Sequence, residues 1–444
     1  MTDTFFPESE YENRDSSRAL VLVPVIKTQR GNEGETTSRA PESRLQEAVG
    51  LARAIGLDVV ASEIVAVNEP RPATLIGTGK IKEIDEILDD RNIGLVIVDH
   101  PLSPVQQRNL EKEWVAKVID RTGLILEIFG ERASTKEGRL QVELAHLNYQ
   151  RGRLVRSWTH LERQRGGGGF MGGPGETQIE ADRRLLRERI TKLERELEQV
   201  VRTRQLHRSK RKKVPHPIVA LVGYTNAGKS TLFNRITGAG VLAEDMLFAT
   251  LDPTLRRMKL PHGRTVILSD TVGFISDLPT HLVAAFRATL EEVLEADLIL
   301  HVRDMADPAR DAQSDDVLRI LGELGIDEKA QNERIIEVWN KLDLLEREEH
   351  DALMARAAAN EAVMGVSAVT GEGVDALVDK IASRLAGVLT ETTITLAPDK
   401  LHLLPWIYEH ALVDERRDLE DGSVSLDIRV PGAEAQRLES MLAG

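Results

Sequence analysis

The chain has 444 residues, 41% of them hydrophobic but only 4% aromatic, and a formal net charge of −14; its length predicts about three domains. It contains no cysteine, which excludes disulfides and thiolate metal sites and suits a reducing cytoplasm, and its 11 histidines show no H-E-x-x-H spacing of a catalytic zinc site. Because no apolar run approaches the roughly 18 residues of a membrane-spanning helix, and the start of the chain is acidic, we expect neither an integral membrane segment nor a signal peptide.

The first folded region is predicted at residues 18–135, after a disordered segment at 1–17. Short apolar runs that alternate with amphipathic stretches predict a small α/β domain with a parallel sheet. The strands are expected at Leu20–Ile26, Leu57–Val65 and Ile93–Asp99, and the helices through Leu45, Val49 and Ala52 and over Ser103–Trp114. Gly77-Thr78-Gly79-Lys80 resembles part of a dinucleotide fingerprint without its third glycine, so it either contacts a phosphate or starts a helix.

Residues 136–214 predict an antiparallel helical hairpin. Two apolar stripes repeat at alternating spacings of four and three residues on either side of the glycine-rich loop Gly166–Gly175. The stripes are Leu140, Leu144, Leu147, Arg151, Leu154, Trp158 and Leu161, then Ile179, Arg183, Leu186, Ile190, Leu193, Leu197 and Val200. Thr177-Gln178-Ile179-Glu180 is expected to open the second helix with a capping box, and each arm to reach roughly 30 Å.

The hairpin region is basic although the whole chain is acidic. From Arg151 to Val214 there are 18 Lys and Arg against 8 Asp and Glu, which leaves a charge of −24 for the remainder. Such a basic segment on an acidic body is the footprint of a local polyanion contact. At the tip, Phe170 and Met171 could stack on unpaired bases. The alternatives are a solvated linker at Arg202–Lys213 and a hairpin that is structural or mediates dimerisation.

Residues 215–390 contain a phosphate-binding loop. Gly223-Tyr224-Thr225-Asn226-Ala227-Gly228-Lys229-Ser230 matches G-x-x-x-x-G-K-[S/T] and directly follows the apolar run Ile218–Val222. A strand that feeds a tight loop at a helix N-terminus lets backbone N–H groups surround phosphate oxygens. Lys229 would neutralise the outer phosphates, and the Ser230 hydroxyl would bind Mg²⁺.

Two switch motifs follow the phosphate loop. Asp270-Thr271-Val272-Gly273 matches D-x-x-G, with Asp270 reaching Mg²⁺ through water and Gly273 facing the terminal phosphate. Phe248-Ala249-Thr250-Leu251-Asp252 lies where the first switch loop belongs, and Thr250 is expected to be the second magnesium hydroxyl. Phe274 occupies the place of the glutamine that orients water in Ras-like proteins, so unassisted hydrolysis should be slow. Asn226 either helps to hold a potassium ion or only stabilises the loop turn.

The base is predicted from Asn340-Lys341-Leu342-Asp343, which matches N-K-x-D after the apolar run Ile335–Trp339. A carboxylate that accepts from the N1–H and the exocyclic amine suits guanine, whereas adenine offers neither donor on that edge. Asn340 is expected to hold the purine from its other side, and Ser367-Ala368 to cover the guanine face. Thr231 completes the set of residues predicted to bind the nucleotide. The residues predicted to support hydrolysis are Lys229, Asn226, Thr250 and Gly273.

Residues 391–444 predict a small β-α-β-α unit. Its strands are expected at Thr392–Leu396 and Ser423–Val430, its first helix at Lys400–Val413, and a short helix at the end.

Together these segments resemble the HflX GTPases of the translation-factor class over almost the whole chain. The resemblance includes the Gly77–Lys80 turn, Leu102–Glu111, Asp120-Arg121-Thr122, the Gly166–Glu180 loop and Phe248–Thr254. It implies a cytoplasmic GTPase that uses Mg²⁺, binds the large ribosomal subunit, places the hairpin loop near the peptidyl-transferase centre and separates ribosomes under stress. It also implies that an apolar residue at position 274 is expected.

We expect a monomer that acts as a GTP-gated clamp on ribosomal RNA, with hydrolysis stimulated by the ribosome. Two alternatives are a GTPase of ribosome assembly or RNA modification, and a regulatory switch whose hairpin binds a protein, with a peripheral membrane location.

Overall fold

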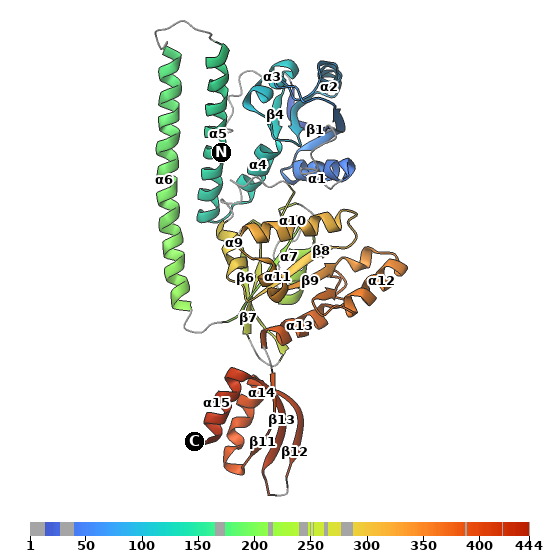
Figure 1. The fold of residues 1–444 in the computed structure, drawn as a ribbon, viewed down its shortest axis with the longest axis vertical. Helices are drawn as coiled ribbons and strands as arrows, with labels where there is room; N and C mark the ends of the chain where they lie inside the picture. The colour runs from blue at the N-terminus through green and yellow to red at the C-terminus, as the bar shows by residue number, and fades with distance from the viewer. Residues whose placement is uncertain are drawn as a thin grey trace.

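The computed structural model describes residues 14–26, 40–164, 174–211, 216–238, 247–248, 250–251, 253–261, 265–276, 287–386, 389–419 and 421–443. These residues form three sheets and a pair of long helices. In Figure 1 the two long helices lie next to the N-terminal sheet.

The N-terminal sheet unit has four parallel strands in the order β2-β1-β3-β4. This arrangement confirms the predicted α/β fold with a parallel sheet, although β4 and α4 were not predicted and α2 was predicted only as one of two explanations of the Gly77–Lys80 motif. Its elements are β1 (Asp15–Ile26), α1 (Pro41–Ala54), β2 (Asp58–Val67), α2 (Thr78–Asp90), β3 (Ile93–Val98), α3 (Pro104–Trp114), β4 (Lys117–Asp120) and α4 (Arg121–Arg132). Gly77 is the N-cap of α2, so the Gly77–Lys80 motif starts a helix, and Lys80 pairs with Glu63 and Glu83.

Strand alternation places apolar side chains on both faces of this sheet, as expected for a parallel sheet covered by helices on each side. Val21 and Ile97 pack with α1 and α4, whereas Leu22 and Val96 pack with α2 and α3. The core on the α1 and α4 side continues without a break into the central unit. The two units therefore share one hydrophobic core on this side.

The two long helices are α5 (Lys136–Gln164) and α6 (Pro174–Arg211). They pack along the predicted seam, with Leu140, Leu147, Ile190 and Leu193 buried between them. At 1.5 Å per residue they reach about 44 Å and about 57 Å, so the predicted arm length of 30 Å was too short. Helix α6 also begins at Pro174 rather than at the predicted Thr177. Proline suits the first position of a helix, so the helix starts about one turn earlier than predicted.

The tip loop at 165–173, including Phe170 and Met171, lies outside the described residues. The same holds for the side chains of Leu154, Trp158, Leu161 and Ile179, the outer part of the predicted seam.

The central unit is a six-stranded sheet in the order β10-β9-β8-β5-β7-β6, parallel except for the edge strand β6. The predicted strands before the phosphate loop, before D-x-x-G and before N-K-x-D are β5, β7 and β9. Its elements are β5 (Ile218–Gly223), α7 (Lys229–Thr237), β6 (Thr254–Lys259), β7 (Thr265–Asp270), α9 (Arg287–Leu294), β8 (Leu298–Asp304), α10 (Arg310–Glu323), α11 (Glu328–Arg334), β9 (Ile335–Asn340), η3 (Leu342–Leu344), α12 (Arg347–Ala358), β10 (Val363–Gly365) and α13 (Val374–Ala386).

The C-terminal unit is a three-stranded antiparallel sheet in the order β11-β13-β12 with two α-helices, at the opposite end of the picture from the N-terminal sheet unit (Figure 1). The predicted β-α-β-α pattern missed β12 and let its first helix run on to Val413. The helix instead ends at His410, because the chain turns into a strand there. The elements are β11 (Leu389–Leu396), η4 (Pro398–Leu403), α14 (Leu404–His410), β12 (Leu412–Asp418), β13 (Val424–Pro431) and α15 (Gly432–Ala443).

None of the helices in the described ranges combines the length with the apolar character that a membrane span requires.

Candidate functional site

The predicted phosphate loop connects the end of β5 to the start of α7, at the carboxyl edge of the central sheet. Gly223 and Gly228 have φ angles of 151° and 90°, values that a residue with a side chain rarely adopts. A Cβ atom at Gly228 would collide with the Asn340 amide, and one at Gly223 with the carbonyl of Val302. Both glycines are therefore needed, and the loop is held tightly against the neighbouring strands.

Lys229 lies at the first turn of α7 and is only 6% exposed. Its ammonium group donates to the carbonyl oxygens of Gly223 at 3.1 Å and Tyr224 at 2.7 Å. Burial lowers the pKa of Lys229 to about 8, against the opposing attraction of Asp270. A buried ammonium held only by carbonyls and one nearby carboxylate is suited to an anion entering the loop.

The three residues predicted to bind magnesium converge at one point. The Ser230 hydroxyl donates to Asp270 Oδ2 at 2.7 Å, and the Thr250 hydroxyl donates to the same oxygen at 2.9 Å. The two hydroxyl oxygens lie 2.9 Å apart. Asp270 Oδ1 is buried and accepts no hydrogen bond from the residues that the structure describes, and burial raises the pKa of this carboxyl group. A second positive charge here would therefore stabilise the carboxylate.

This donor set fits Mg²⁺, which prefers hard oxygen ligands and is usually held by one or two carboxylates together with the phosphates of the substrate. Among the described residues there is no cluster of three or more His, Cys, Asp or Glu side chains that could hold a metal alone. Ser230, Thr250 and Asp270 would therefore hold the ion jointly with a bound nucleotide, where it supplies positive charge to the phosphates.

The segment after β7 lies directly on the phosphate loop. We call residues 270–276 the second switch segment. Phe274 donates its N–H to Gly223 at 3.0 Å, and its carbonyl accepts from Thr225 N at 2.7 Å. Gly273 packs so closely that a Cβ atom would lie 2.8 Å from Thr225 Cα. The Thr271 hydroxyl donates to the Leu221 carbonyl at 2.5 Å.

The Phe274 side chain is 2% exposed and belongs to the shared core, as does Val272. A buried phenyl ring cannot orient a water molecule, which agrees with the expectation of slow unassisted hydrolysis.

The first switch loop is described only in part, because Ala249 and Asp252 lie outside the described residues. Phe248 has a φ angle of 58° and is 2% exposed. Its ring meets Phe129 of α4 edge to face, with centroids 4.8 Å apart. Leu251 is also buried. The loop therefore packs on the N-terminal sheet unit.

The other loop residues differ in exposure. Asn226 is exposed and has a φ angle of 60°, a conformation that asparagine tolerates better than most residues. This backbone gives the loop-turn explanation of Asn226 a physical basis, and the potassium explanation stays a prediction. Ala227 and Thr225 are buried, and Thr231 is half-buried on α7.

Asn340, at the end of β9, joins two loops of the site. Its side-chain N–H donates to the Ala227 carbonyl at 2.8 Å, and its side-chain oxygen accepts from Ala368 N at 3.0 Å. In the structure Asn340 thus ties the phosphate loop to the Ser367-Ala368 loop, and its predicted contact with the purine stays a prediction.

Asp343 is exposed in η3, and its Oδ1 accepts a hydrogen bond of 2.6 Å from the buried Ser367 hydroxyl. Ser367 Oγ also accepts from Thr370 N at 3.1 Å. Lys341 has a φ angle of 63° and pairs with Asp304 at 2.8 Å. An exposed carboxylate with a fixed orientation is what recognition of two adjacent N–H donors requires.

Sequence analysis missed Arg235 on α7. Its guanidinium donates to the Ala368 carbonyl at 3.1 Å and to the Val369 carbonyl. It therefore fixes the Ser367-Ala368 loop to the helix that follows the phosphate loop. Asn234-Arg235 lies just after the phosphate-loop motif, but nothing in its spacing indicates a partner more than a hundred residues away.

Four family models match successive parts of the chain. They are described as GTP-binding GTPase N-terminal (residues 42–130), GTP-binding GTPase Middle Region (132–211), 50S ribosome-binding GTPase (218–341) and HflX C-terminal domain (352–444).

Curated relatives are similar over most of their length. A protein named GTPase HflX from Magnetococcus marinus is 50% identical over 389 residues, which are 88% of either chain. GTPase HflX from Escherichia coli is 43% identical over 429 residues, covering 96% of this chain and 97% of that one. Among solved structures, the complex of SsGBP with GDP is 24% identical with a TM-score of 0.46, over 82% of this chain and 97% of that chain. The relatives and the family models agree, so the chain belongs to the HflX family of GTPases, whose activity is GTP hydrolysis.

Proposed function

We propose that this GTPase binds the large ribosomal subunit when GTP occupies the site, contacts ribosomal RNA near the peptidyl-transferase centre with the helical tip, and promotes separation of the subunits under stress. Hydrolysis on the ribosome then releases it. The observation that supports this most is that one chain combines a converged nucleotide site with a pair of long helices, the first of which shares a hydrophobic core with Tyr224 and Phe274 of the site.

In this proposal Lys229 neutralises the outer phosphates, and the backbone of the phosphate loop and Gly273 surround them. Ser230, Thr250 and Asp270 hold Mg²⁺, which supplies positive charge to the phosphates when bound. Asp343, oriented by Ser367, selects guanine. The residues assigned to nucleotide binding are Gly223–Thr231, Phe248–Asp252, Asp270–Gly273, Asn340, Lys341, Asp343, Ser367 and Ala368. Asn226 could add a potassium ion.

The contact with RNA is supported by charge and reach. The segment from Arg151 to Val214 has 18 basic against 8 acidic residues, on a body of opposite sign. The arms that carry this charge extend about 44 Å and about 57 Å. The match to a model described as 50S ribosome-binding GTPase supports the large subunit as the partner.

The rest of the proposal concerns organisation. Four domains are placed at 18–135, 136–214, 215–390 and 391–444, in a monomer that acts in the cytoplasm. The same geometry also serves a GTPase of ribosome assembly or RNA modification, or a switch that binds a protein, and the following experiment separates these functions.

The test is cosedimentation of the full-length protein with purified large subunits, whole ribosomes, precursor subunits and tRNA, each with no nucleotide, GDP, GTP or a non-hydrolysable GTP analogue. We expect strong association with mature large subunits in the analogue only, stimulated hydrolysis with large subunits, and ribosome dissociation measured by light scattering. Association that does not depend on the nucleotide would contradict the proposal, and preference for precursors or tRNA would favour the first alternative.

A variant with a shortened Gly166–Gly175 loop should lose ribosome separation and keep its GTP affinity, whereas an equal deletion within residues 28–37 should keep both. Many phosphate contacts also predict a steep loss of association with salt, which a protein partner would not give.

A further inference from the structure

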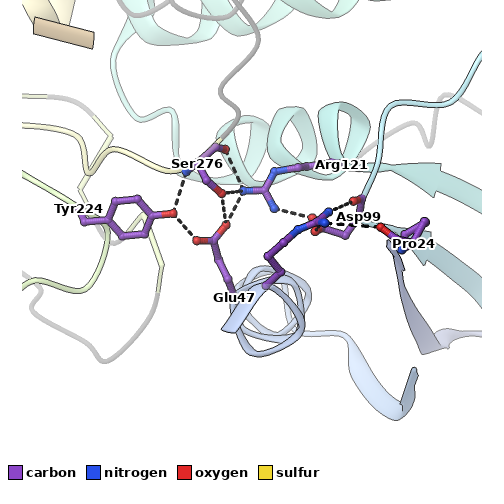
Figure 2. A network of polar contacts seen from close by, with 7 residues as sticks. Pro24, Glu47, Asp99, Arg121, Tyr224 and Ser276 are labelled. Atoms are coloured by element: carbon purple, nitrogen blue, oxygen red, sulfur yellow. Dashed lines mark hydrogen bonds and ion pairs between the residues drawn. The ribbon is translucent and has the colours of Figure 1, made fainter. Parts of the chain in front are cut away.

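A buried polar network joins the N-terminal sheet unit to the nucleotide site (Figure 2). At its centre is Arg121, the first residue of α4, which is 5% exposed. Its guanidinium donates to the carboxylates of Asp99 and Glu47. It also donates to Ser276 in the second switch segment, to the carbonyl at 2.9 Å and to the hydroxyl at 2.8 Å.

Glu47 of α1 holds the other side of the same segment. It accepts from the Tyr224 hydroxyl and, at 2.9 Å, from the Ser276 hydroxyl. The Tyr224 hydroxyl in turn accepts from Ser276 N at 2.7 Å. Tyr224 belongs to the phosphate loop, and Ser276 lies three residues after Gly273. The network therefore contacts both parts of the site that surround the terminal phosphate.

Asp120, the residue before Arg121, faces the helical arms. Its Oδ1 caps α4 by accepting from Gly123 N at 2.8 Å, and it accepts from the Tyr149 hydroxyl of α5 at 2.7 Å. Arg153, one turn further along α5, lies 3.7 Å from Asp120 Oδ2 and stacks over the Tyr149 ring at 4.6 Å. Two consecutive residues thus contact the second switch segment on one side and the arm on the other.

We propose that Asp120 and Arg121 are positioning residues that couple the second switch segment to α5. This inference rests on the proposed function, because it supplies the route by which bound GTP would set the position of the arms.

The coupling follows from the free-energy cost of breaking the buried hydrogen bonds between Arg121 and Ser276. If Ser276 moves when a terminal phosphate enters, Arg121 either follows it or loses two hydrogen bonds in a buried site. Arg121 would keep its carboxylate partners Asp99 and Glu47, but buried N–H groups without an acceptor are unfavourable, so following is the easier outcome. Arg121 begins α4 and Asp120 caps it, so a displaced Arg121 displaces the cap. The Tyr149 and Arg153 contacts then pass the displacement to α5.

A second arginine extends the network on the side of Asp99. Arg44 donates to the Asp99 carboxylate at 3.1 Å and to its carbonyl at 2.9 Å, which fixes the carboxylate that holds Arg121. Burial alone would lower the pKa of Arg121, but Asp99 and Glu47 raise it above its usual value, so the guanidinium stays charged.

The first measurement is hydrogen exchange of the α5 amides between residues 140 and 153 in the full-length protein, with GDP and with a non-hydrolysable GTP analogue. We expect the two nucleotides to give different exchange in the wild type, and this difference to become smaller in Ser276→Ala and in Tyr149→Phe, which each remove one of several contacts. Each variant removes one hydroxyl from one end of the route and keeps the fold. Equal exchange with both nucleotides in the wild type, or an undiminished difference in the variants, would overturn the inference, and neither result requires a ribosome.

The second measurement is the ratio of affinities for purified large subunits with the analogue and with GDP. Each variant should reduce this ratio by about fivefold, as expected for the net contribution of one ordinary hydrogen bond. The double variant should reduce it no further, because both changes break the same route. Additive reductions would contradict a shared route. A ratio of one in the wild type would instead reject the proposed function.

Matched controls remove the same atoms elsewhere. Ser423→Ala removes a buried hydroxyl and Tyr408→Phe an exposed one, both in the C-terminal unit. Neither should change the exchange difference or the affinity ratio. If they did, the changes at Ser276 and Tyr149 would report general loosening rather than coupling.

Discussion

The candidate site has two ends, which differ in how far their charged side chains are exposed. The phosphate end contains Asp270 and the phosphate loop with Lys229, and the base end contains Asp343 and Ser367. At the phosphate end, Lys229 and Asp270 are 6% and 0% exposed, and an oxygen of Asp270 accepts no hydrogen bond within the described part of the chain. At the base end, Asp343 is exposed and its orientation comes from the buried Ser367 hydroxyl. The phosphate end therefore contains buried charges that a bound ligand would stabilise. The base end contains one oriented charge that is exposed to solvent.

This difference indicates a division of labour. Charges interact more strongly when water is excluded, so the phosphate end should supply most of the affinity and the rate. A hydrated carboxylate adds less affinity than a buried charge, because it exchanges water for the base, but it rejects a base that cannot donate to it. Substitutions at the two ends should therefore fail in different ways.

The largest effect is expected for Lys229→Met. Without the ammonium group, GTP hydrolysis should fall by about a thousandfold, since preorganised positive charge at the phosphates is a major part of phosphoryl-transfer catalysis. The binding of guanosine, which has no phosphate, should change little. Single-turnover hydrolysis and calorimetric titration with GTP and guanosine measure both quantities.

The control for Lys229→Met is thermal unfolding of the free protein. Burial makes the lysine charge costly, as its lowered pKa indicates, so the variant should unfold at the same temperature or a higher one. An equal loss of guanosine and GTP binding would contradict the division between the two ends.

At the base end, Asp343→Asn should weaken GTP binding by about a hundredfold, because an amide cannot accept from both N1–H and the exocyclic amine. Xanthosine triphosphate, which carries a carbonyl in place of that amine, should gain affinity, since asparagine offers one acceptor and one donor. Competition titrations of the two nucleotides test this exchange. Ser367→Ala, which keeps the carboxylate but removes its hydrogen bond, should weaken GTP without favouring xanthosine triphosphate.

Local sequence patterns could predict much of this site, because each motif follows a buried parallel strand. Parallel strands bring their carboxyl ends to one edge of the sheet, so Ser230 and Asp270 had to meet once their strands were identified. The predicted parallel sheet and the inner part of the helical seam, around Leu140, Leu147, Ile190 and Leu193, are confirmed for the same reason, because a short apolar run and a spacing of four and three residues are local properties.

What the sequence could not predict depends on distant pairs or on unusual composition. Ser276 and Glu47 are 229 positions apart, and no periodicity indicates which buried carboxylate meets which hydroxyl. Strand β12 was missed because Asp414–Asp418 is charged and exposed, as suits an edge strand but not a typical strand pattern. The start of α6 was misplaced because Pro174-Gly175 resembles a loop.

The smallest effect is expected from a change of pH, which should alter the affinity for GTP at the phosphate end and leave binding at the base end unchanged. In the free protein burial lowers the pKa of Lys229 to about 8, and bound phosphates should raise it, because they favour the charged form. Between these two values GTP binding takes up a proton, so the affinity must fall as the pH rises. From pH 7 to about 8.5, below the range in which guanine loses its N1 proton, the affinity for GTP should fall by about fourfold.

Guanosine, which reaches only the base end, should bind equally well across this range. Lys229→Arg provides the matched variant, because a guanidinium stays charged at every pH used and should remove the slope for GTP. The proton uptake itself can be measured by titration in buffers of different ionisation enthalpy. A slope shared by GTP and guanosine, or one that persists in Lys229→Arg, would assign the titration to a group outside the phosphate end.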